Sequence, residues 1–394
     1  MFSVELEERM SAVIKVIGLG GGGGNAVDSM ARIGINDVEL IAANTDNQAL
    51  QNIQATRKIK LGKNTVLGAG GDPEKGKAAA EECSEQLINE IRGTNLLFIA
   101  AGMGGGTGTG AAPVVASIAK SIRDDNRNTM VVAVVTKPFN TEGRKKAMIA
   151  EAGIAELRKS ADVVIVVPND KVIELIGDDE DDVPLQESFK RVDNVLGQAV
   201  RGISELISTS GIINRDMADL ERVLSMKGDA HFGVGYYEIG SEDNKTKKIE
   251  RATKAAELAI NNRLLETSID GARAILINIV GPKDLGTNET NRAMKMVQDR
   301  LSENAEIYYG TAIDDNTTGV TVTIFATGLG ESSSAYSNND TLYSPRRNVI
   351  NEPIPNNRQF NTDYQRQENN TVNQEPVINR NPDYPHFLNV KRRK

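Results

Sequence analysis

Two glycine-rich segments each follow a run of apolar residues, and both have the composition of an anion-binding loop. Residues 104–110 read GGGTGTG, five glycines and two threonines, and residues 18–25 read GLGGGGGN. Several backbone N–H groups of such a loop can point at one anion, and the start of a following helix adds partial positive charge. We therefore expect both loops to bind phosphate groups. Because the G-x-x-x-x-G-K-[ST] motif does not occur in the sequence, backbone groups rather than a lysine should hold them.

The first loop also fits a second interpretation. Gly18, Gly20 and Gly23 satisfy G-x-G-x-x-G, the dinucleotide fingerprint, although five consecutive glycines match almost any glycine pattern. With Glu39 or Asp46 on the ribose, this interpretation gives a nicotinamide-dependent oxidoreductase. It leaves the loop at 104–110 unexplained.

The segments around these loops predict strands that alternate with helices. Continuous apolar runs are typical of strands buried on both faces of a sheet. Such runs occupy 12–18, 38–44, 95–102, 129–137 and 162–168. Helices are expected to begin near Asn25 and after Asp72, where Asp72 is the predicted N-cap and Pro73 the first helical residue. The alternation predicts an α/β fold with a doubly wound, mainly parallel sheet, whose ligands bind at the carboxyl ends of the strands.

The rest of the chain divides by composition. Apolar residues at helical spacing over 187–209 predict a long amphipathic helix, and four apolar strands after it indicate a smaller second α/β domain. Residues 331–381 are rich in Asn, Ser, Gln and Pro, and are expected to form a flexible linker. The expected parts are a flexible N-terminus 1–11, a phosphate-binding domain 12–183, a central helix 184–210, a second domain 211–329, a disordered linker 330–381 and a terminal peptide 382–394.

Composition excludes several classes of protein. The chain has 394 residues and a net charge of −8, which argues against nonspecific attraction to nucleic acid or anionic membranes. A single cysteine, Cys83, excludes an internal disulfide and suits a reducing compartment. The first residues, MFSVELEERM, lack the features of a signal peptide, and no apolar stretch approaches the roughly 20 residues of a membrane span. We therefore expect a cytoplasmic protein.

Five short motifs occur in order along the chain. They are GLGGGGGNAV at 18–27, ANTDNQAL at 43–50, GGGTGTG at 104–110, VVTKPFNTEG at 134–143 and GIINRDMADL at 211–220. Together they resemble the tubulin/FtsZ family over about residues 12–329, and the similarity returns at 383–388. The resemblance implies a tubulin-like GTPase that binds GTP or GDP with Mg²⁺. It also implies that the protein polymerises head to tail into the cytokinetic ring at the bacterial division site.

The resemblance further implies a set of nucleotide-binding residues. Those around the phosphates are Gly20, Gly21, Gly22, Gly23, Gly24, Asn25, Gly104, Gly105, Gly106, Thr107, Gly108, Thr109 and Gly110. Those near the rest of the nucleotide are Asn44, Asp46, Gly70, Gly71, Glu142, Lys146, Asn169, Phe189 and Asp193. The threonines could add hydroxyl donors or metal-facing oxygens, but the sequence identifies no metal ligands.

The base and the ribose would be recognised by side chains. The resemblance implies that Glu142 contacts the ribose, that Asn169 lies near the base and that Phe189 stacks on guanine. Asp193, four residues after Phe189, shares its helix face, and a carboxylate can accept the two N–H groups that guanine offers and adenine lacks. Lys146 stands where the family usually has arginine, so this contact would be weaker unless Arg144 compensates for it.

Neither glycine loop contains a candidate general base, so hydrolysis must draw on another segment. In NRDMADL, Asn214 can cap a helix from which Asp216 and Asp219 project on one face. The resemblance implies that this catalytic loop, 211–222, enters the nucleotide pocket of the next subunit and positions the attacking water. Contact between two different patches generates open filaments rather than closed dimers.

The end of the chain suggests a partner. Tyr384, Pro385, Phe387 and Leu388 lie beside the basic sequence KRRK, and resemble the family's peptide for membrane-tethering division adaptors. The family usually has Ile-Pro where this chain has Tyr384-Pro385. No nucleic-acid partner and no membrane span are expected. A tubulin-like filament that segregates plasmids is the alternative within the same fold, and the terminal peptide favours division.

Overall fold

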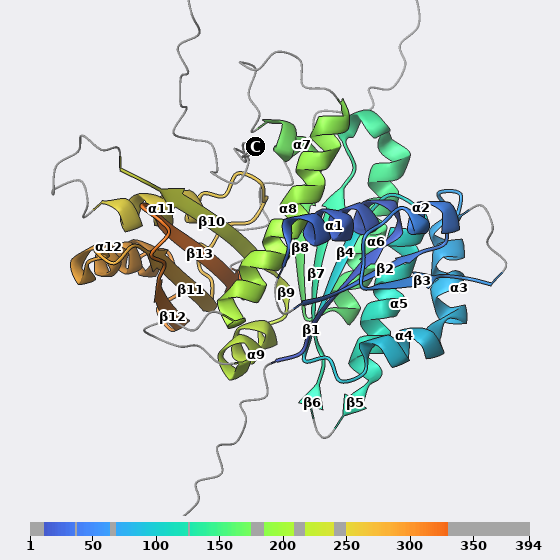
Figure 1. Ribbon diagram of the computed structural model, residues 1–394, viewed down its shortest axis with the longest axis horizontal. Coiled ribbons are helices and arrows are strands. Elements are labelled where there is room, and N and C mark those ends of the chain that lie inside the picture. Colours follow the sequence, from blue (N-terminus) through green and yellow to red (C-terminus); the bar gives the residue numbers. More distant parts are fainter. Residues whose placement is uncertain are drawn as a thin grey trace, which may run out of the picture.

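The computed structural model describes residues 12–35, 38–63, 68–124, 127–174, 185–208, 217–239 and 250–329, which form two packed units (Figure 1). Expectations for the N-terminus, the linker 330–381 and the terminal peptide lie outside these residues, as do Asn214 and Asp216.

The first unit is built on a seven-stranded sheet in the order β3-β2-β1-β4-β7-β8-β9, in which every pair of neighbours is parallel. Its strands are β1 (Ile14–Leu19), β2 (Val38–Asn44), β3 (Arg57–Lys60), β4 (Leu96–Gly102), β7 (Met130–Lys137), β8 (Val163–Pro168) and β9 (Gly228–Asp229). All of β7 except its last residue is buried, as its continuous apolar run predicts. The predicted doubly wound parallel sheet is confirmed.

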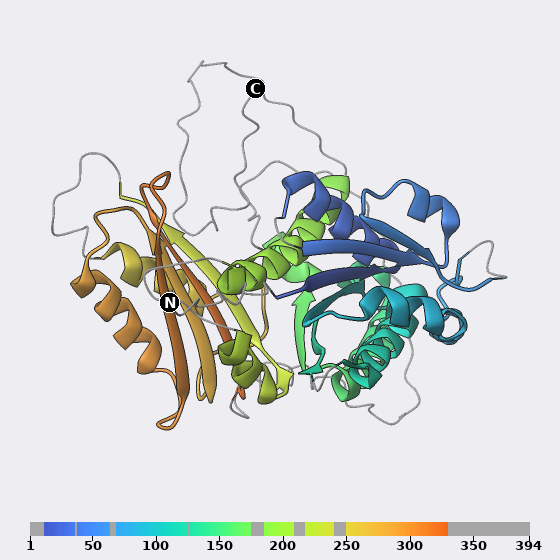
Figure 2. The same ribbon diagram turned by 60° about the horizontal axis from the view of Figure 1, so that its bottom comes forward.

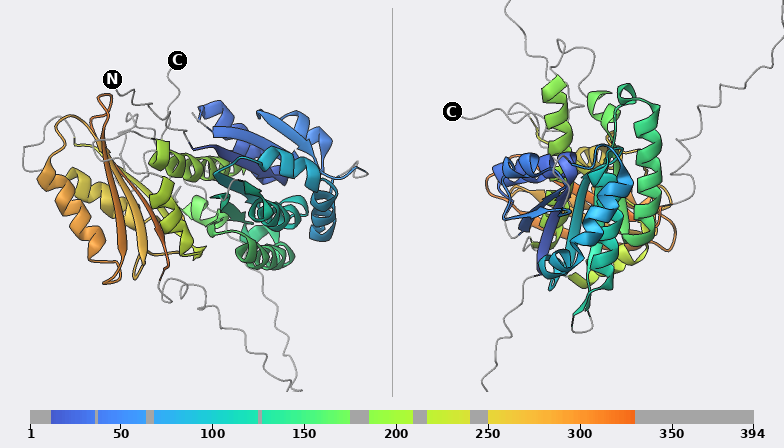
Figure 3. Two further views of the ribbon diagram at one scale, coloured as in Figure 1. Left: turned by 90° about the horizontal axis from the view of Figure 1, so that it is seen from below. Right: turned by 90° about the vertical axis from the view of Figure 1, so that its right-hand side faces the viewer.

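Helices cover both faces of this sheet (Figure 3). Helices α1 (Gly20–Ile33) and α2 (Asn47–Gln51) pack on one face together with α8 (Leu185–Ser208). The opposite face is covered by α3 (Pro73–Glu82), α4 (Ser84–Ile91), α5 (Thr107–Ser121) and α6 (Arg144–Ser160). A short helix, α7 (Asn169–Glu174), follows β8 directly.

Two details correct the sequence-based expectations. The helix expected to begin near Asn25 begins at Gly20, so most of the first glycine run is the start of α1 rather than a loop before it. The apolar pattern after Asp72 predicts one continuous helix, but the backbone leaves helical geometry at Cys83, and two helices form instead. The predicted cap is confirmed, because the Asp72 carboxylate accepts the N–H of Glu74.

The second unit is a mixed four-stranded sheet in the order β10-β13-β11-β12 (Figure 2). Its elements are β10 (His231–Tyr237), α11 (Arg251–Ile260), β11 (Ala274–Gly281), α12 (Thr287–Gln298), β12 (Glu306–Ile313) and β13 (Val320–Thr327). Only β11 and β12 are parallel; β13 runs antiparallel to β10 and to β11. The sheet lies between α11 and α12 on one side and α8 and α9 (Met217–Ser225) on the other.

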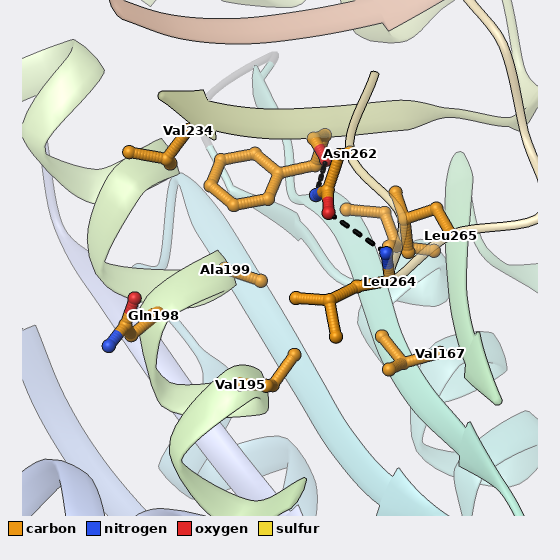
Figure 4. Close-up of a pocket in the computed structure, with 10 residues that line it drawn as sticks. Val167, Val195, Gln198, Ala199, Val234, Asn262, Leu264 and Leu265 are labelled. Carbon is orange, nitrogen blue, oxygen red and sulfur yellow. Dashed lines mark hydrogen bonds between the residues drawn. The ribbon is translucent and has the colours of Figure 1, made fainter. Parts of the chain in front are cut away.

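A small apolar cavity lies where the two units meet (Figure 4). Side chains from β8, α8, β10 and residues 262–265 line it, and none of them is charged. Asn262 closes one side, because its amide donates to the Phe232 carbonyl (2.7 Å) and its side-chain oxygen accepts the N–H of Leu264 (3.0 Å). This lining has none of the converging N–H groups that a phosphate needs.

Candidate nucleotide site

The two glycine-rich segments meet at the carboxyl edge of the first sheet. Strands β1 and β4 are neighbours, with Leu19 opposite Ala101, so their following segments begin side by side. A Cβ added to Gly20 would lie 2.9 Å from the backbone nitrogen of Gly108, which places the starts of α1 and α5 in contact. Neither helix has an acidic residue in its first turn. Two positive helix N-termini therefore face the same space, a favourable arrangement for an anion.

Several of the glycines serve packing rather than ligand binding. A Cβ on Gly23 would lie 2.1 Å from the Ala100 carbonyl oxygen, and one on Gly108 would lie 2.5 Å from that of Gly102. A Cβ on Gly110 would lie 2.0 Å from the Pro73 carbonyl oxygen of α3. Real Cβ atoms do not approach carbonyl oxygens this closely. These positions therefore need glycine so that α1 and α5 can pack against the strands and against α3.

Two glycines have no such requirement. A Cβ on Gly21 or Gly105 would meet no protein atom within 4 Å, and neither residue has a positive φ angle. An alanine at either position would fit the protein itself. Both positions therefore face open space, Gly21 in the first turn of α1 and Gly105 just before α5, so a ligand can approach the backbone closely there.

The second glycine segment is held in place by its neighbours. Gly104, with a φ of +98°, donates its N–H to the Thr109 hydroxyl oxygen (2.9 Å), and Met103 donates to the Thr136 carbonyl (2.9 Å). The Thr107 and Thr45 hydroxyl oxygens lie 2.6 Å apart. Thr109 is almost fully buried, so its hydroxyl orients the loop.

The predicted residues on β2 and in the turn before α3 also lie at this edge. The Asp46 carboxylate caps α2 through the N–H groups of Gln48 and Ala49, and Asn44 accepts the N–H of Asp46. Gly70 and Gly71 both have positive φ angles. Their turn contacts the second glycine segment, because a Cβ on Gly106 would lie 2.7 Å from Ala69 Cβ.

The predicted base-binding residues come from α7 and α8. Asn169 begins α7 directly after β8 and is buried, yet its side-chain oxygen has no hydrogen-bond partner. An orphaned buried acceptor is rare in folded proteins and fits a site that a ligand donor completes. Phe189 is 40% exposed, and its ring makes an edge-to-face contact with that of Phe139, with centroids 5.1 Å apart.

Asp193 lies one helical turn after Phe189 and has an unusual titration. Burial, with a smaller contribution from the Asp28 carboxylate, raises the pKa of Asp193 to about 7. At neutral pH this carboxyl is therefore about half protonated in the site as it stands, whereas an ordinary aspartate is fully ionised. A ligand that offers two N–H donors would stabilise the charged form.

Glu142 and Lys146 form an ion pair at the start of α6. Lys146 Nζ lies 2.9 Å from Glu142 Oε2, and Glu142 Oε1 accepts the N–H of Phe139 at 2.9 Å. Lys146, at the position where the family usually has arginine, thus already has a carboxylate partner in Glu142.

Asp219 lies away from all of these residues. It belongs to the first turn of α9, and the chain then enters β9, which pairs with Val163 and Val164 at the beginning of β8. α9 is therefore near the amino edge of the sheet, at the far end of α8 from α7 (Figure 1). The 24 residues of α8 span about 36 Å. The structure does not bring Asp219 to the glycine segments of the same chain.

Comparison with known proteins settles the family. The Tubulin/FtsZ family GTPase domain matches residues 13–177, and the FtsZ family C-terminal domain matches residues 228–330. An FtsZ dimer from M. jannaschii, solved empty, is 39% identical to this chain, with a TM-score of 0.71 over 82% of this chain and 89% of that one.

The chain belongs to the tubulin/FtsZ family.

This is a family of GTPases, so the open edge of the first sheet is where a guanine nucleotide is expected to bind. CetZ2 from Haloferax volcanii, solved as a GTPγS-bound protofilament, is 21% identical, with a TM-score of 0.69 over 82% of this chain and 95% of that one. CetZ1 from the same organism, a GDP-bound monomer, is 19% identical, with a TM-score of 0.68 over 82% and 98%. At these identities the similarity to CetZ proteins shows the shared fold alone.

Two further features are absent from the described residues. None of their helices has the length and apolar character to cross a membrane. Within the same residues, no cluster of three or more His, Cys, Asp or Glu side chains could hold a metal ion.

Phe139 and Thr45 were not predicted as site residues, although they lie in the motifs at 134–143 and 43–50. Phe139 is an aromatic residue in a short connection between a strand and a helix, and this was the available signal. No sequence signal identified Thr45, because its contact with Thr107 joins two segments that are far apart in the sequence.

Proposed function

We propose that this protein binds GTP at the carboxyl edge of its first sheet and hydrolyses it within head-to-tail filaments that form the cytokinetic ring. The observation that carries the proposal is the contact between the starts of α1 and α5, with open space at the Cβ positions of Gly21 and Gly105. The orphaned Asn169 oxygen supports it, because that acceptor lies at the carboxyl end of β8 in the same sheet.

In this proposal backbone N–H groups of residues 20–25 and 104–110 hold the phosphates. Phe189 stacks on the base, and the Asp193 carboxylate accepts the ring and amino N–H groups of guanine. Asn169 accepts a further donor, while Glu142 and Lys146 lie at the ribose. Asn44, Asp46, Gly70 and Gly71 shape the remaining wall.

Mg²⁺ fits this arrangement as an ion held largely by phosphate oxygens. Magnesium commonly keeps several waters and takes few protein ligands when it is bound with a nucleotide. The described residues offer no carboxylate cluster for it, and the Thr107 hydroxyl is the candidate protein oxygen. When bound, the ion would neutralise charge on the phosphates during transfer.

Hydrolysis would require a second copy of the chain. Because Asp219 lies at the amino edge of the sheet, it can serve a nucleotide only in a neighbouring subunit stacked end to end. Asp216, which precedes the first residue of α9, would act with it on the attacking water, and Asn214 would belong to the same catalytic loop. The contacting patches differ, so the assembly grows as an open filament.

Turnover as a function of protein concentration tests the shared site. GTPase activity per molecule should rise steeply above a threshold concentration, and constant specific activity through the micromolar range would contradict the proposal. Asp216→Ala should retain GTP binding and lose turnover, since the residue acts on the neighbour's nucleotide. Mixing it with Gly106→Ser, which is damaged in its own pocket, should restore part of the activity at hybrid interfaces.

The terminal peptide would link the filament to the membrane through adaptors. Tyr384, Pro385, Phe387 and Leu388 are the proposed contacts. Deleting residues 383–394 should leave polymerisation and GTPase activity unchanged and abolish adaptor recruitment, measured by co-sedimentation and by localisation in dividing cells. Localisation to segregating plasmids instead of the division site would contradict the proposed ring.

A further inference from the structure

We propose that Phe139 is a positioning residue for base recognition, which holds the Phe189 ring in the orientation that stacks on guanine. The inference rests on the proposed function, since it concerns the base half of the same site. Phe139 comes from the connection between β7 and α6, whereas Phe189 comes from α8, so their contact joins two separate walls of the site.

The geometry gives the two rings different roles. Phe139 is 4% exposed and Phe189 is 40% exposed, so one ring is part of the core while the other still presents area to solvent. Their planes meet at 80°, the edge-to-face arrangement that aromatic quadrupoles favour. Contact with Phe139 restricts the Phe189 side chain and leaves part of it open to a base.

Hydrogen bonds on both sides fix the backbone of Phe139. Its N–H donates to Glu142 Oε1 (2.9 Å), and its carbonyl accepts the N–H of Glu142 (2.9 Å). The next residue, Asn140, donates its N–H to both carboxylate oxygens of Asp170 in α7, at 3.2 and 3.3 Å. Phe139 is thereby tied to the beginnings of α6 and α7, the helices that border the site.

The physical consequence concerns rotamers. A partly exposed phenylalanine on a helix surface has two accessible χ1 values, and choosing one on binding reduces affinity. The contact with Phe139 fixes the χ1 value of Phe189 when the protein folds. The Phe189 ring therefore has its binding orientation before the nucleotide binds. Removing Phe139 should therefore weaken binding of the base and leave phosphate binding unchanged.

The test replaces the ring while preserving bulk. Phe139→Met should weaken GTP binding two- to tenfold, the range that corresponds to losing one aromatic pair. Affinity for inorganic triphosphate, which has no base, should not change. Phe98→Met is the matched control, since Phe98 is fully buried on β4, and it should change the affinity ratio of GTP to triphosphate by less than twofold. Phe139→Tyr retains a ring and should restore the wild-type ratio.

A double-mutant cycle tests whether Phe139 affects GTP affinity through Phe189. In a Phe189→Ala background, Phe139→Met should cause no further loss of GTP affinity, because the ring it positions is gone. Equal losses in both backgrounds would overturn the proposal, and so would equal losses for GTP and triphosphate.

A measurement without nucleotide separates this inference from the proposed function. The chain contains no tryptophan, so Phe189→Trp introduces a single indole at the stacking position. Its fluorescence anisotropy should fall when Phe139→Met is added, and an unchanged anisotropy would refute the positioning role. Failure of the wild-type protein to bind GTP, with the anisotropy change intact, would instead refute the proposed function.

Discussion

The two halves of the candidate site are built from different materials. The phosphate half consists of backbone at the starts of α1 and α5, with glycines that either pack tightly or leave open space. The base half consists of side chains from α7 and α8, with an orphaned oxygen on Asn169 and an Asp193 carboxyl whose pKa burial raises to about 7.

The two halves should therefore be sensitive to different changes. Backbone N–H groups keep the same charge at every pH, so the phosphate half should respond to added atoms and not to titration. The side chains of the base half are costly to bury without a partner, so they should respond to charge and to the identity of the base.

Removing the carboxylate of the base half should have the largest effect. Asp193→Ala should lower GTP affinity by about 2–4 kcal/mol, because two charge-assisted hydrogen bonds are lost. ATP affinity, measured on the same protein by competition titration, is the control and should change little. Equal small losses for both nucleotides would show that the base is recognised elsewhere.

The second largest loss of GTP affinity is expected when one methyl group is added to the phosphate half. Gly105→Ala should lower GTP affinity by about 1.5–3 kcal/mol, since the methyl group would occupy space intended for a phosphate oxygen. Thermal unfolding of the nucleotide-free protein should be nearly unchanged. Gly286→Ala is the matched control, because Gly286 also has open space around its Cβ position but lies in the second unit. A large stability loss in Gly105→Ala alone would mean that the glycine serves packing.

The pH dependence of binding distinguishes the halves without destroying either. Since guanine donors stabilise the ionised carboxylate, GTP binding favours the deprotonated form of Asp193, whose pKa is about 7 in the empty site. Affinity should therefore rise with pH by up to about tenfold per unit below pH 7 and level off above about pH 8. Calorimetry in Asp193→Ala supplies the control. If both proteins show the same pH profile, Asp193 does not bind the base as a carboxylate.

The smallest effect is expected at the ion pair between the halves. Lys146→Arg should change GTP affinity by less than about threefold, because either cation can pair with the half-buried Glu142 carboxylate from an exposed position, and such pairs contribute about 0–1 kcal/mol. Lys145→Arg on the neighbouring exposed position is the control. A tenfold gain would show that the fork of arginine makes a ribose or phosphate contact that lysine cannot.

For physical reasons, the sequence predicted the strands and loops of the phosphate half more fully than the side-chain contacts of the base half. Apolar runs buried on both faces identify parallel strands, and glycine after such a strand identifies the binding edge, so β1, β4 and their loops followed from local composition. The same composition could not separate Gly23, which packs on Ala100, from Gly105, which faces open space.

Long-range contacts account for the rest. The edge-to-face pair of Phe139 and Phe189 joins residues 50 positions apart, and no local pattern encodes it. The raised pKa of Asp193 depends on burial and on Asp28 from another helix. The break at Cys83 and the early start of α1 depend on how each helix meets the sheet.

The two-residue strand β9 limits how the chain can be divided experimentally. Gly228 and Asp229 belong to the segment matched by the FtsZ C-terminal domain, yet they pair with β8 in the first sheet, and Asp229 accepts two hydrogen bonds from Arg158 of α6. A truncated protein that stops at residue 174 would leave the β8 edge without its partner and Arg158 without its carboxylate. Unpaired edges invite pairing between molecules, so such a fragment should aggregate, whereas a cut after residue 229 keeps β9 paired with β8 and Asp229 with Arg158.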